Sequence, residues 1–257
     1  MTETDPTPTA DQEPTRRTAL VTGGGSGIGR AVALALAEAG LDVLVTGRRP
    51  AALAETAARH PAIRTHVADV ADPDDHEAIV AAAARSGRID VLINNAGIGA
   101  PGDLGDIAAD VARQTWSTNV LGPILLTQAA LPYLIKARGS IINISSTYGV
   151  KPAPGHSVYG ASKAALEHLT RSWALELAEH GIRVNAVAPG PTESEALLRM
   201  GLSDEQIAAI KDEERRLIPL RRRGEVEDVV PWVVALADHR GWVTGQIIGV
   251  DGGYALT

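Results

Sequence analysis

Two side chains in the middle of the chain have the types and the spacing for proton transfer at an oxygen atom. Tyr159 and Lys163 form a Y-x-x-x-K motif at the start of a predicted helix, where an interval of four residues puts both on one face. A phenol titrates near ~10, and a nearby ammonium favours the phenolate and lowers that pKa. The pair can therefore give a proton to a nascent alkoxide or take one from an alcohol. The alternative is an interfacial tyrosine beside a surface lysine.

A third candidate, Ser146, follows the apolar run G-S-I-I-N-I-S, thirteen residues before Tyr159. A hydroxyl at the carboxyl end of a strand can donate a hydrogen bond to a substrate carbonyl. Its neighbour Ser145 is the obvious competitor for this role. Because successive strand residues point to opposite faces, only one of the two can face the site.

A glycine-rich turn, T-G-G-G-S-G-I-G over residues 22–29, connects the first predicted strand to a helix. Gly23, Gly27 and Gly29 allow a tight turn and close approach of the backbone to a pyrophosphate, which would sit at the helix N-terminus. The spacing is not the usual G-x-G-x-x-G of dinucleotide-binding proteins. The turn alone could also serve another nucleotide or S-adenosylmethionine.

The end of the second predicted strand indicates which nicotinamide cofactor the turn would bind. A carboxylate there would accept a hydrogen bond from the ribose of NAD, whereas arginine accommodates the 2′-phosphate of NADP. Here Gly47 fills that position, and Arg48 and Arg49 follow it. Since arginine binds phosphate bidentately, we expect NADP(H), with NAD(H) not excluded. The alternative is that both arginines are ordinary surface residues.

These residues require a framework in which strands alternate with helices. Several of the strands are near-continuous apolar runs, as expected for strands covered on both faces. We predict an α/β fold of the Rossmann type, a doubly wound parallel seven-stranded sheet in a single domain. The predicted strands are Thr18–Gly23, Asp42–Gly47, Ile63–Asp69, Ile89–Asn94, Ser140–Ser145, Arg183–Ala188 and Gln246–Val250. The predicted helices are Arg30–Ala39, Pro50–Arg59, Pro73–Arg85, Asp110–Ala137, Ser157–His180 and Val226–Ala237.

Two segments fall outside this alternation. Residues 1–17 are rich in proline, threonine and acidic residues, and we predict a disordered tail before a domain over residues 18–257. Residues 191–223 form an insertion that we predict to be a lid over the binding site. Its charge runs D-E-E-R-R and R-R-R are interpreted as a solvated helix face.

Composition excludes several classes of function. The 257 residues carry a net charge of −7, which argues against a nucleic-acid binder. No uncharged apolar run reaches the ~18–20 residues of a membrane span, and no signal peptide is recognisable. The absence of cysteine excludes disulfides and thiolate catalysis. The histidines show no metal-ligand spacing, so we expect no metal. Because no signal peptide is recognisable, we expect a cytoplasmic protein.

Eight short motifs together resemble the short-chain dehydrogenase/reductase family, in its shorter, single-domain branch that includes 3-oxoacyl reductases. The resemblance covers nearly everything from Thr18 to Tyr254. The motifs, all in the family's order and spacing, are T-G-x-x-x-G-I-G (22–29), A-D-V (68–70), N-N-A-G (94–97), N-V (119–120), the serine of I-S-S (146), Y-x-A-S-K (159–163), N-x-V-A-P-G (185–190) and V-D-G-G (250–253).

The resemblance implies a catalytic tetrad of Asn119, Ser146, Tyr159 and Lys163. Asn119 would interrupt a helix and support a water relay that ends at Lys163, which would also hold the nicotinamide ribose. The implied cofactor contacts, together with those argued above, are Gly23, Ser26, Gly27, Ile28, Gly29, Arg48, Arg49, Asp69, Val70, Asn95, Ala96, Gly97, Tyr159, Lys163, Pro189, Gly190 and Thr192. The family's next threonine is Ser194 here. A homotetramer or homodimer is also implied.

Some residues near the site have no role in the family. Tyr148 and His156 lie between Ser146 and Tyr159, and His156 is interpreted as a solvent-facing loop residue, with an extra proton carrier as the alternative. Trp116 is interpreted as a packing residue. Pro101, Leu104, Val150, Pro152 and Leu197 suggest a partly apolar substrate pocket.

We therefore predict an oxidoreductase that moves hydride between NADP(H) and a small carbonyl compound or secondary alcohol, most simply a ketoreductase. A reductase of acyl-carrier-protein substrates falls within this prediction. The alternatives are an NAD-dependent alcohol or steroid-type dehydrogenase, and a non-catalytic nucleotide sensor on the same fold. An S-adenosylmethionine methyltransferase would leave Ser146, Tyr159 and Lys163 without a use.

Overall fold

The apolar strand residues form a sheet that is covered on both faces, because consecutive side chains such as Ala19, Leu20 and Val21 are all fully buried. The computed structural model describes residues 16–99, 101–194 and 203–257. All strand pairs are parallel, in the order β3-β2-β1-β4-β5-β6-β7. The strands are β1 (Thr18–Thr22), β2 (Asp42–Gly47), β3 (Ile63–Val67), β4 (Val91–Asn94), β5 (Ser140–Ile144), β6 (Arg183–Pro189) and β7 (Ile247–Val250).

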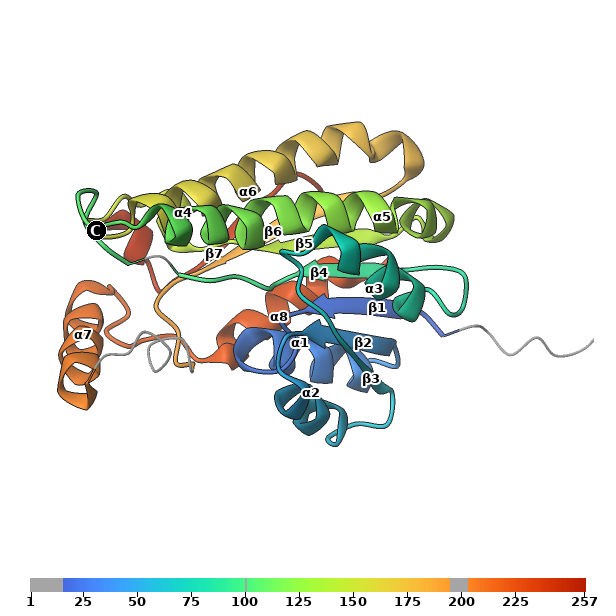
Figure 1. Cartoon of the computed structure of the whole chain (residues 1–257), viewed down its shortest axis with the longest axis horizontal. Helices are drawn as coiled ribbons and strands as arrows, with labels where there is room; N and C mark the ends of the chain where they lie inside the picture. The colour runs from blue at the N-terminus through green and yellow to red at the C-terminus, as the bar shows by residue number, and fades with distance from the viewer. Residues whose placement is uncertain (1–15, 100, 195–202) are drawn as a thin grey trace, which may run out of the picture.

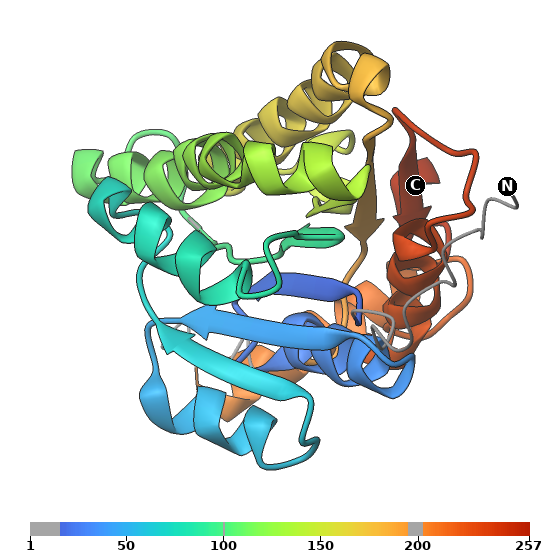
Figure 2. The same ribbon diagram turned by 90° about the vertical axis from the view of Figure 1, so that its right-hand side faces the viewer.

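Helices cover both faces of this sheet, as Figures 1 and 2 show. On one face, Val21 of β1 packs with Val32 and Val233 of two helices, and on the other Leu20 packs with Leu126 and Ala130. The alternation of β1 thus divides the core into two layers. The helices are α1 (Gly27–Glu38), α2 (Pro50–Ala57), α3 (His76–Ala83), α4 (Ala109–Trp116), α5 (Gly122–Ala137), α6 (Ser157–Glu176), α7 (Asp204–Leu217) and α8 (Val226–Ala237).

The strand order reverses between β1 and β4, where β1 is flanked by β2 on one side and β4 on the other. In a doubly wound sheet, ligands bind outside the carboxyl ends of the strands at such a switch point. The glycine turn after β1 and the segment after β4 both begin there. The topology therefore places the predicted nucleotide turn where a dinucleotide site is expected.

The predicted helix over Asp110–Ala137 is interrupted. A five-residue π turn, Ser117–Leu121, separates α4 from α5 and contains Asn119, in agreement with the interruption expected there. By length and composition, Ala109–Ala137 is the one stretch among the described residues that could cross a membrane. In the fold, Leu126, Ala130 and Leu134 of α5 are fully buried against the sheet, so α5 packs as a core helix.

Many element boundaries coincide with the predicted ones, and most of the others differ by one to three residues. The Ser157–His180 helix ends at Glu176 and is followed by a short 3-10 turn, Ala178–His180. Residues 1–15 of the predicted tail lie outside the described residues. Arg17, which we placed in the tail, is held by the domain: its guanidinium donates to the Ala237 carbonyl at 2.8 Å and lies 3.8 Å from the Asp90 carboxylate.

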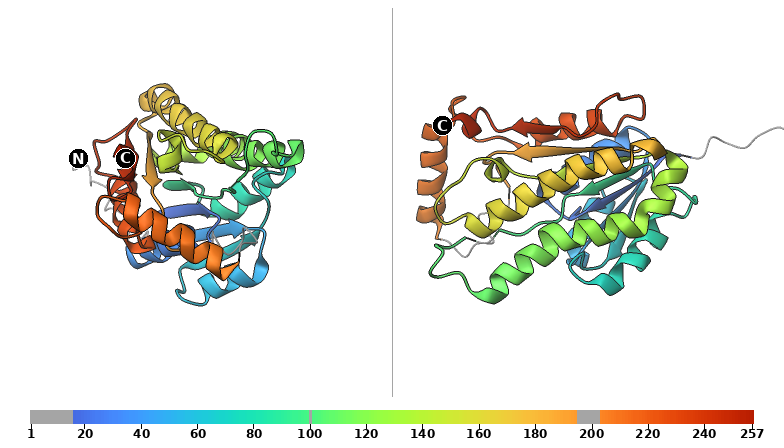
Figure 3. Two further views of the ribbon diagram at one scale, coloured as in Figure 1. Left: turned by 90° about the vertical axis from the view of Figure 1, so that its left-hand side faces the viewer. Right: turned by 90° about the horizontal axis from the view of Figure 1, so that it is seen from above.

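The insertion over residues 191–223 contains the helix α7. Figures 1 and 3 show α7 beyond the end of the sheet, at the same end of the molecule as the C-terminus. Ser203 caps α7 by accepting a hydrogen bond from the Gln206 amide, and the Gln206 side chain accepts from the Ser203 amide in return. The local sequence thus fixes where this helix begins.

Candidate active site

A cleft of about 960 Å³ opens at the carboxyl ends of the strands. Ser146, Tyr159 and Lys163 of the predicted tetrad line it, whereas Asn119 lies behind its wall. Gly29 is the one predicted cofactor residue that does not line it. The others all do: Gly23, Ser26, Gly27, Ile28, Arg48, Arg49, Asp69, Val70, Asn95, Ala96, Gly97, Tyr159, Lys163, Pro189, Gly190 and Thr192.

The glycine turn is held by the segment that follows β4. The Asn95 side-chain amide donates to the Thr22 carbonyl at 2.8 Å, and the Thr22 hydroxyl accepts from the backbone amides of Asn95 and Ala96. Gly23 has a φ of +66°, and a Cβ there would lie 2.8 Å from the Asn95 side chain. A Cβ at Gly29 would lie 2.5 Å from the Gly23 carbonyl oxygen. Gly29 therefore closes the turn rather than facing a ligand.

Two arginines stand at the end of β2 beside this turn. Arg48 is about half exposed, and its guanidinium lies 3.6 Å from the Asp69 carboxylate. Arg49 donates to the Ser26 hydroxyl at 3.0 Å. The two side chains thus bring positive charge and hydrogen-bond donors to the cleft next to the helix N-terminus of α1. This arrangement suits a phosphate group.

Ser145 and Ser146 face different surroundings, as strand alternation predicted. Ser145 donates a 2.8 Å hydrogen bond to the buried carboxylate of Glu167. The Ser146 hydroxyl accepts from the Tyr148 amide at 3.2 Å, and it hydrogen-bonds the Tyr159 side chain. Ser146 is thus the serine beside the phenol.

At the floor of the cleft the Lys163 side chain is buried, and the Tyr159 side chain beside it is half-buried. Burial raises the pKa of Tyr159, and the hydrogen bond with Ser146 opposes that rise. The Lys163 Nζ donates to the Ile144 carbonyl at 2.8 Å and lies 5.9 Å from the centre of the Tyr159 ring. The sequence argument expected the ammonium to lower the phenol's pKa, but without a ligand the desolvation of Tyr159 dominates.

Burial also lowers the pKa of Lys163, to about 8, and the negative charge of Glu167 opposes this shift. Glu167 lies one helical turn after Lys163 on α6 and is 2% exposed. Burial raises its own pKa. The sequence argument missed Glu167, although its interval of four residues from Lys163 is the signal that found Tyr159.

Asn119 holds the segment after β4 rather than facing the cleft. Its side-chain oxygen accepts from the Ile98 amide at 2.9 Å, and its side-chain nitrogen donates to the Ile98 carbonyl and to the Ser162 hydroxyl, each at 3.0 Å. The π turn thereby connects α6 to the wall of the cleft. The water relay that the resemblance implies stays a prediction.

An aromatic group lies next to Tyr159. The Tyr148 and His156 rings stack with centres 4.3 Å apart, and Tyr148 meets Tyr159 and Tyr254 edge to face, each at 6.3 Å. All four residues line the cleft. Our interpretation of His156 as a solvent-facing residue was wrong, because its ring packs on Tyr148. Nothing in the loop sequence indicates the contribution of Tyr254, which comes from the C-terminus.

Other expectations for the substrate end are mixed. Pro101 and Ser194 line the cleft, and Trp116 does not. Leu104 and Val150 are 83% and 61% exposed, so they are surface residues rather than parts of the pocket. Leu197 lies outside the described residues. Instead, Ile210 and Leu217 of α7 supply apolar surface to the cleft.

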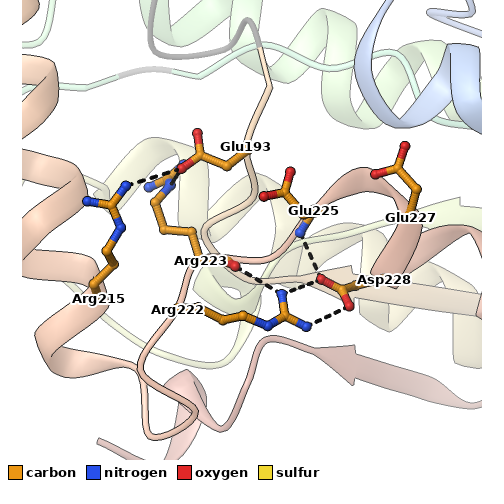
Figure 4. A pocket seen from close by; sticks show the side chains of 7 residues that line it. All are labelled: Glu193, Arg215, Arg222, Arg223, Glu225, Glu227 and Asp228. Carbon is orange, nitrogen blue, oxygen red and sulfur yellow. Dashed lines mark hydrogen bonds and ion pairs between the residues drawn. The ribbon is translucent and has the colours of Figure 1, made fainter.

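A cluster of ion pairs joins α7 to the segment after β6, as Figure 4 shows in part. Arg223, 5% exposed, contacts the carboxylates of Glu193 (3.0 Å) and Glu214. Lys211 donates to Glu193 at 2.6 Å. We call these four residues the Arg223 cluster. Our interpretation of the charge runs as a solvated face was wrong for Arg223 and Glu214, which also line the cleft.

Comparisons with known proteins agree with this geometry. The pattern of the family described as Enoyl-(Acyl carrier protein) reductase matches residues 23–255. The chain is similar to the 3-oxoacyl-(acyl-carrier-protein) reductase FabG of Thermotoga maritima, with 37% identity over 92% of this chain and 97% of the relative. It is 39% identical to the FabG of Staphylococcus aureus over 92% of this chain and 97% of the relative.

Two solved structures also resemble the chain closely. A short-chain dehydrogenase/reductase from Caenorhabditis elegans, solved with cofactor, has a TM-score of 0.87 at 33% identity and covers 94% of this chain and 96% of its own. A short-chain type dehydrogenase/reductase from Mycobacterium ulcerans has a TM-score of 0.85 at 33% identity and covers 93% and 90%. Sequence and fold therefore agree over nearly the whole chain.

Proposed function

Because the chain belongs to the short-chain dehydrogenase/reductase family of oxidoreductases, we propose that it reduces a ketone to a secondary alcohol with NADPH. The observation that carries the proposal is the convergence of Ser146, Tyr159 and the buried Lys163 in one cleft. A hydroxyl pair next to an ammonium can bind a carbonyl oxygen and protonate it. A nucleotide sensor would not need that group at the end of its cleft.

The residues at the nucleotide end fit NADP(H). Any Cβ at Gly23 would collide with Asn95 and Ala96, so glycine is needed for the turn to pack against that segment. The N-terminus of α1, to which the turn leads, suits a pyrophosphate. Gly47 offers no carboxylate to a ribose 2′-hydroxyl, and Arg48 and Arg49 lie where a 2′-phosphate would need partners. Pro189, Gly190 and Thr192 would face the nicotinamide. When bound, the cofactor supplies the hydride.

The chain's own residues would then supply binding and the proton. Ser146 donates a hydrogen bond to the substrate carbonyl, which orients it and stabilises the negative charge that develops on oxygen. Tyr159 gives its phenolic proton to that oxygen. The positive charge of the Lys163 ammonium stabilises the phenolate that remains, whether or not the ammonium keeps its hydrogen bond to the Ile144 carbonyl. The aromatic group around Tyr148 and the apolar residues of α7 exclude water from the substrate.

The proposal is tested by following NADPH oxidation with a panel of ketones that includes a β-keto thioester, since the relatives named above are 3-oxoacyl reductases. We expect ketone-dependent loss of NADPH and an equal amount of alcohol. NADPH binding without turnover on any ketone would favour the sensor. Tighter binding of NADH, with oxidation of secondary alcohols, would favour the NAD-dependent dehydrogenase.

We further propose that the protein is a homotetramer, with a homodimer as the alternative. Leu175 on α6, Trp242 before β7 and Leu256 at the C-terminus are large apolar residues with 83%, 101% and 89% of their surfaces exposed. Burial of such residues would favour association of subunits. Sedimentation equilibrium at micromolar concentration would distinguish four subunits from two. A cytoplasmic location stays a prediction.

A further inference from the structure

The Arg223 cluster has no part in the proposed chemistry, yet it is buried next to the predicted nicotinamide contacts. Arg223 lies in the run Arg221-Arg222-Arg223, but it differs from Arg222, whose guanidinium is 56% exposed and pairs with Asp228 at 2.6 Å on the surface. The Arg223 side chain is 4% exposed. A buried guanidinium needs compensating partners on every side, so its partners indicate what it holds together.

Those partners come from two different segments. Its Nε lies 3.0 Å from a Glu193 oxygen, and one terminal nitrogen contacts Glu214 on α7. The other terminal nitrogen donates to the Thr192 carbonyl at 2.8 Å. Only the contact with Thr192 is a hydrogen bond; the other two nitrogens lie against the carboxylates of Glu193 and Glu214 as ion pairs.

The backbone around Thr192 is held by the same end of the insertion. The Glu193 amide donates to the Gly224 carbonyl at 2.8 Å, and the Gly224 amide donates to the Pro191 carbonyl at 2.9 Å. On its other side, the Gly190 amide donates to the Val250 carbonyl at 3.0 Å. The Arg223 guanidinium thus adds a side-chain tie to a short parallel bridge between Thr192 and Gly224.

Charge within the cluster supports this arrangement. Burial would raise the pKa of Glu193, but the hydrogen bond from Lys211 and the charge of Arg223 lower it overall. Glu193 therefore stays ionised between two cations. Without Arg223, the carboxylates of Glu193 and Glu214 would face the same desolvated space with too little positive charge, and they would repel each other.

We propose that Arg223 is a positioning residue: by binding Thr192, Glu193 and Glu214 together, it holds the nicotinamide-facing segment and α7 in the arrangement that the bound cofactor requires. This inference rests on the proposed function, because it assumes that Thr192 faces the nicotinamide. It assigns Arg223 no contact with the reacting atoms. Its effect should be confined to the nicotinamide end of the cleft, since the adenosine end is formed by β1, β2 and α1.

The test compares two ligands that share the adenosine end. NADPH reaches both ends of the cleft, whereas 2′,5′-ADP lacks the nicotinamide. For Arg223→Met we expect an affinity for NADPH about tenfold weaker, since a displaced Thr192 segment would lose contacts to the nicotinamide end of the ligand. The affinity for 2′,5′-ADP should stay within about twofold of wild type. Isothermal titration measures both.

Arg222→Met is the matched control, because it removes the same group from the adjacent residue; it breaks the surface pair with Asp228 and a hydrogen bond to the Arg223 carbonyl but leaves the Arg223 side-chain contacts intact. It should leave both affinities unchanged. Should Arg223→Met fail to fold, Glu193→Gln replaces it, since it keeps the size of the side chain but removes the charge that faces Arg223. It should weaken NADPH binding in the same selective way, by about threefold.

The possible results separate this inference from the proposed function. Selective loss of NADPH affinity supports the role of Arg223. Equal loss of both ligands would show that Arg223 only supports the fold, and no loss would show that the cluster is dispensable; either result overturns the inference while leaving the proposed function in place. If the wild-type protein binds neither ligand, the proposed function fails and the inference fails with it.

Discussion

The two ends of the cleft are built from different materials. At the nucleotide end, glycines and backbone amides after β1 form the surface, and Asn95 and Thr22 hold them in place. At the carbonyl end, side chains form the surface. Ser146 and Tyr159 lie beside Lys163 at the floor, and the Arg223 cluster lies at the wall. We therefore expect substitutions that add atoms to impair cofactor binding at the nucleotide end. At the carbonyl end, we expect substitutions that remove or exchange side-chain atoms to impair the reaction.

The largest effect should come from removing one oxygen at the carbonyl end. Tyr159→Phe eliminates the proton donor but leaves the ring and the glycine turn intact. We expect turnover to fall by about 10²- to 10⁴-fold, the usual contribution of a positioned acid or base. NADPH affinity should change little. The two quantities are measured by steady-state kinetics and by fluorescence titration.

Tyr133→Phe is the control for this variant, because Tyr133 lies on α5 and does not line the cleft. It should keep wild-type turnover. Substantial residual activity in Tyr159→Phe would mean that another group supplies the proton, and His156 would be the first to examine.

At the nucleotide end, adding one carbon should have the next largest effect. Gly23→Ala places a Cβ 2.8 Å from the Asn95 side chain and 3.0 Å from the Ala96 Cα, at a φ of +66°. We expect NADPH affinity to fall by more than about tenfold, since displacement of the turn removes backbone contacts to the pyrophosphate. Titration with NADPH measures the loss.

Gly40→Ala provides the comparison, because Gly40 has a φ of +87° but no atom within 4 Å of an added Cβ. Both variants should lose about 1–2 kcal/mol of unfolding free energy from the left-handed backbone. Only Gly23→Ala should lose NADPH affinity. An equal loss of affinity in both would mean that backbone strain alone, and not the collision at the turn, impairs binding.

The arginines at the end of β2 are the exception to the backbone construction of the nucleotide end. Arg48→Asp should weaken NADPH binding by about tenfold, since a charge-assisted contact is worth about 1.5–3 kcal/mol. NADH binding should hold or improve, because a carboxylate can accept from the ribose hydroxyl. Arg59→Asp makes the same charge change on an exposed residue outside the cleft, and it should alter neither the NADPH affinity nor the NADH affinity. An unchanged preference in Arg48→Asp would place recognition of the 2′-phosphate elsewhere.

The smallest effect should be a shift in pH dependence at the carbonyl end. Lys163 acts as a cation, and its pKa of about 8 means that the charge is present below that pH and is lost as the pH rises through it. Reductive kcat/KM should therefore decline on the alkaline side. Glu167→Gln removes the carboxylate that favours the ammonium, so the decline should begin at lower pH.

The control is Glu176→Gln, on an exposed position of the same helix. Its pH profile should match that of the wild type. If Glu167→Gln also matched the wild type, the Lys163 charge would be set by other groups, or its titration would not limit the rate.

Sequence patterns predicted the nucleotide end better than the carbonyl end, for a physical reason. The succession of apolar strands along the chain and the glycine turn with Gly23 and Gly27 can be recognised from short stretches of sequence, because backbone geometry depends mainly on neighbouring residues. The Ser146–Tyr159–Lys163 group could also be found, since helix spacing and strand alternation decide which side chains share a face. Strand alternation also required Ser145 and Ser146 to face different surroundings, whereas the choice of Ser146 came from the family resemblance.

Pairing over long separations could not be predicted. Nothing in the run of three arginines shows that Arg223 is buried while Arg222 is exposed, because the difference depends on contacts with Glu193 and Glu214, which lie outside the run. Tyr254 joins the aromatic group for the same reason: the C-terminus returns to the cleft. The substrate end is therefore where a structure adds most to the sequence.

The most direct test of ketone reduction is to follow the transferred hydrogen. The protein would be incubated with a ketone and NADPH carrying deuterium at both positions of nicotinamide C4, and the alcohol would be examined by mass spectrometry. We predict one deuterium on the carbinol carbon of each product molecule, and none on that carbon when unlabelled NADPH is used in deuterated water. Alcohol without deuterium on that carbon, or no alcohol despite bound NADPH, would contradict hydride transfer at this site.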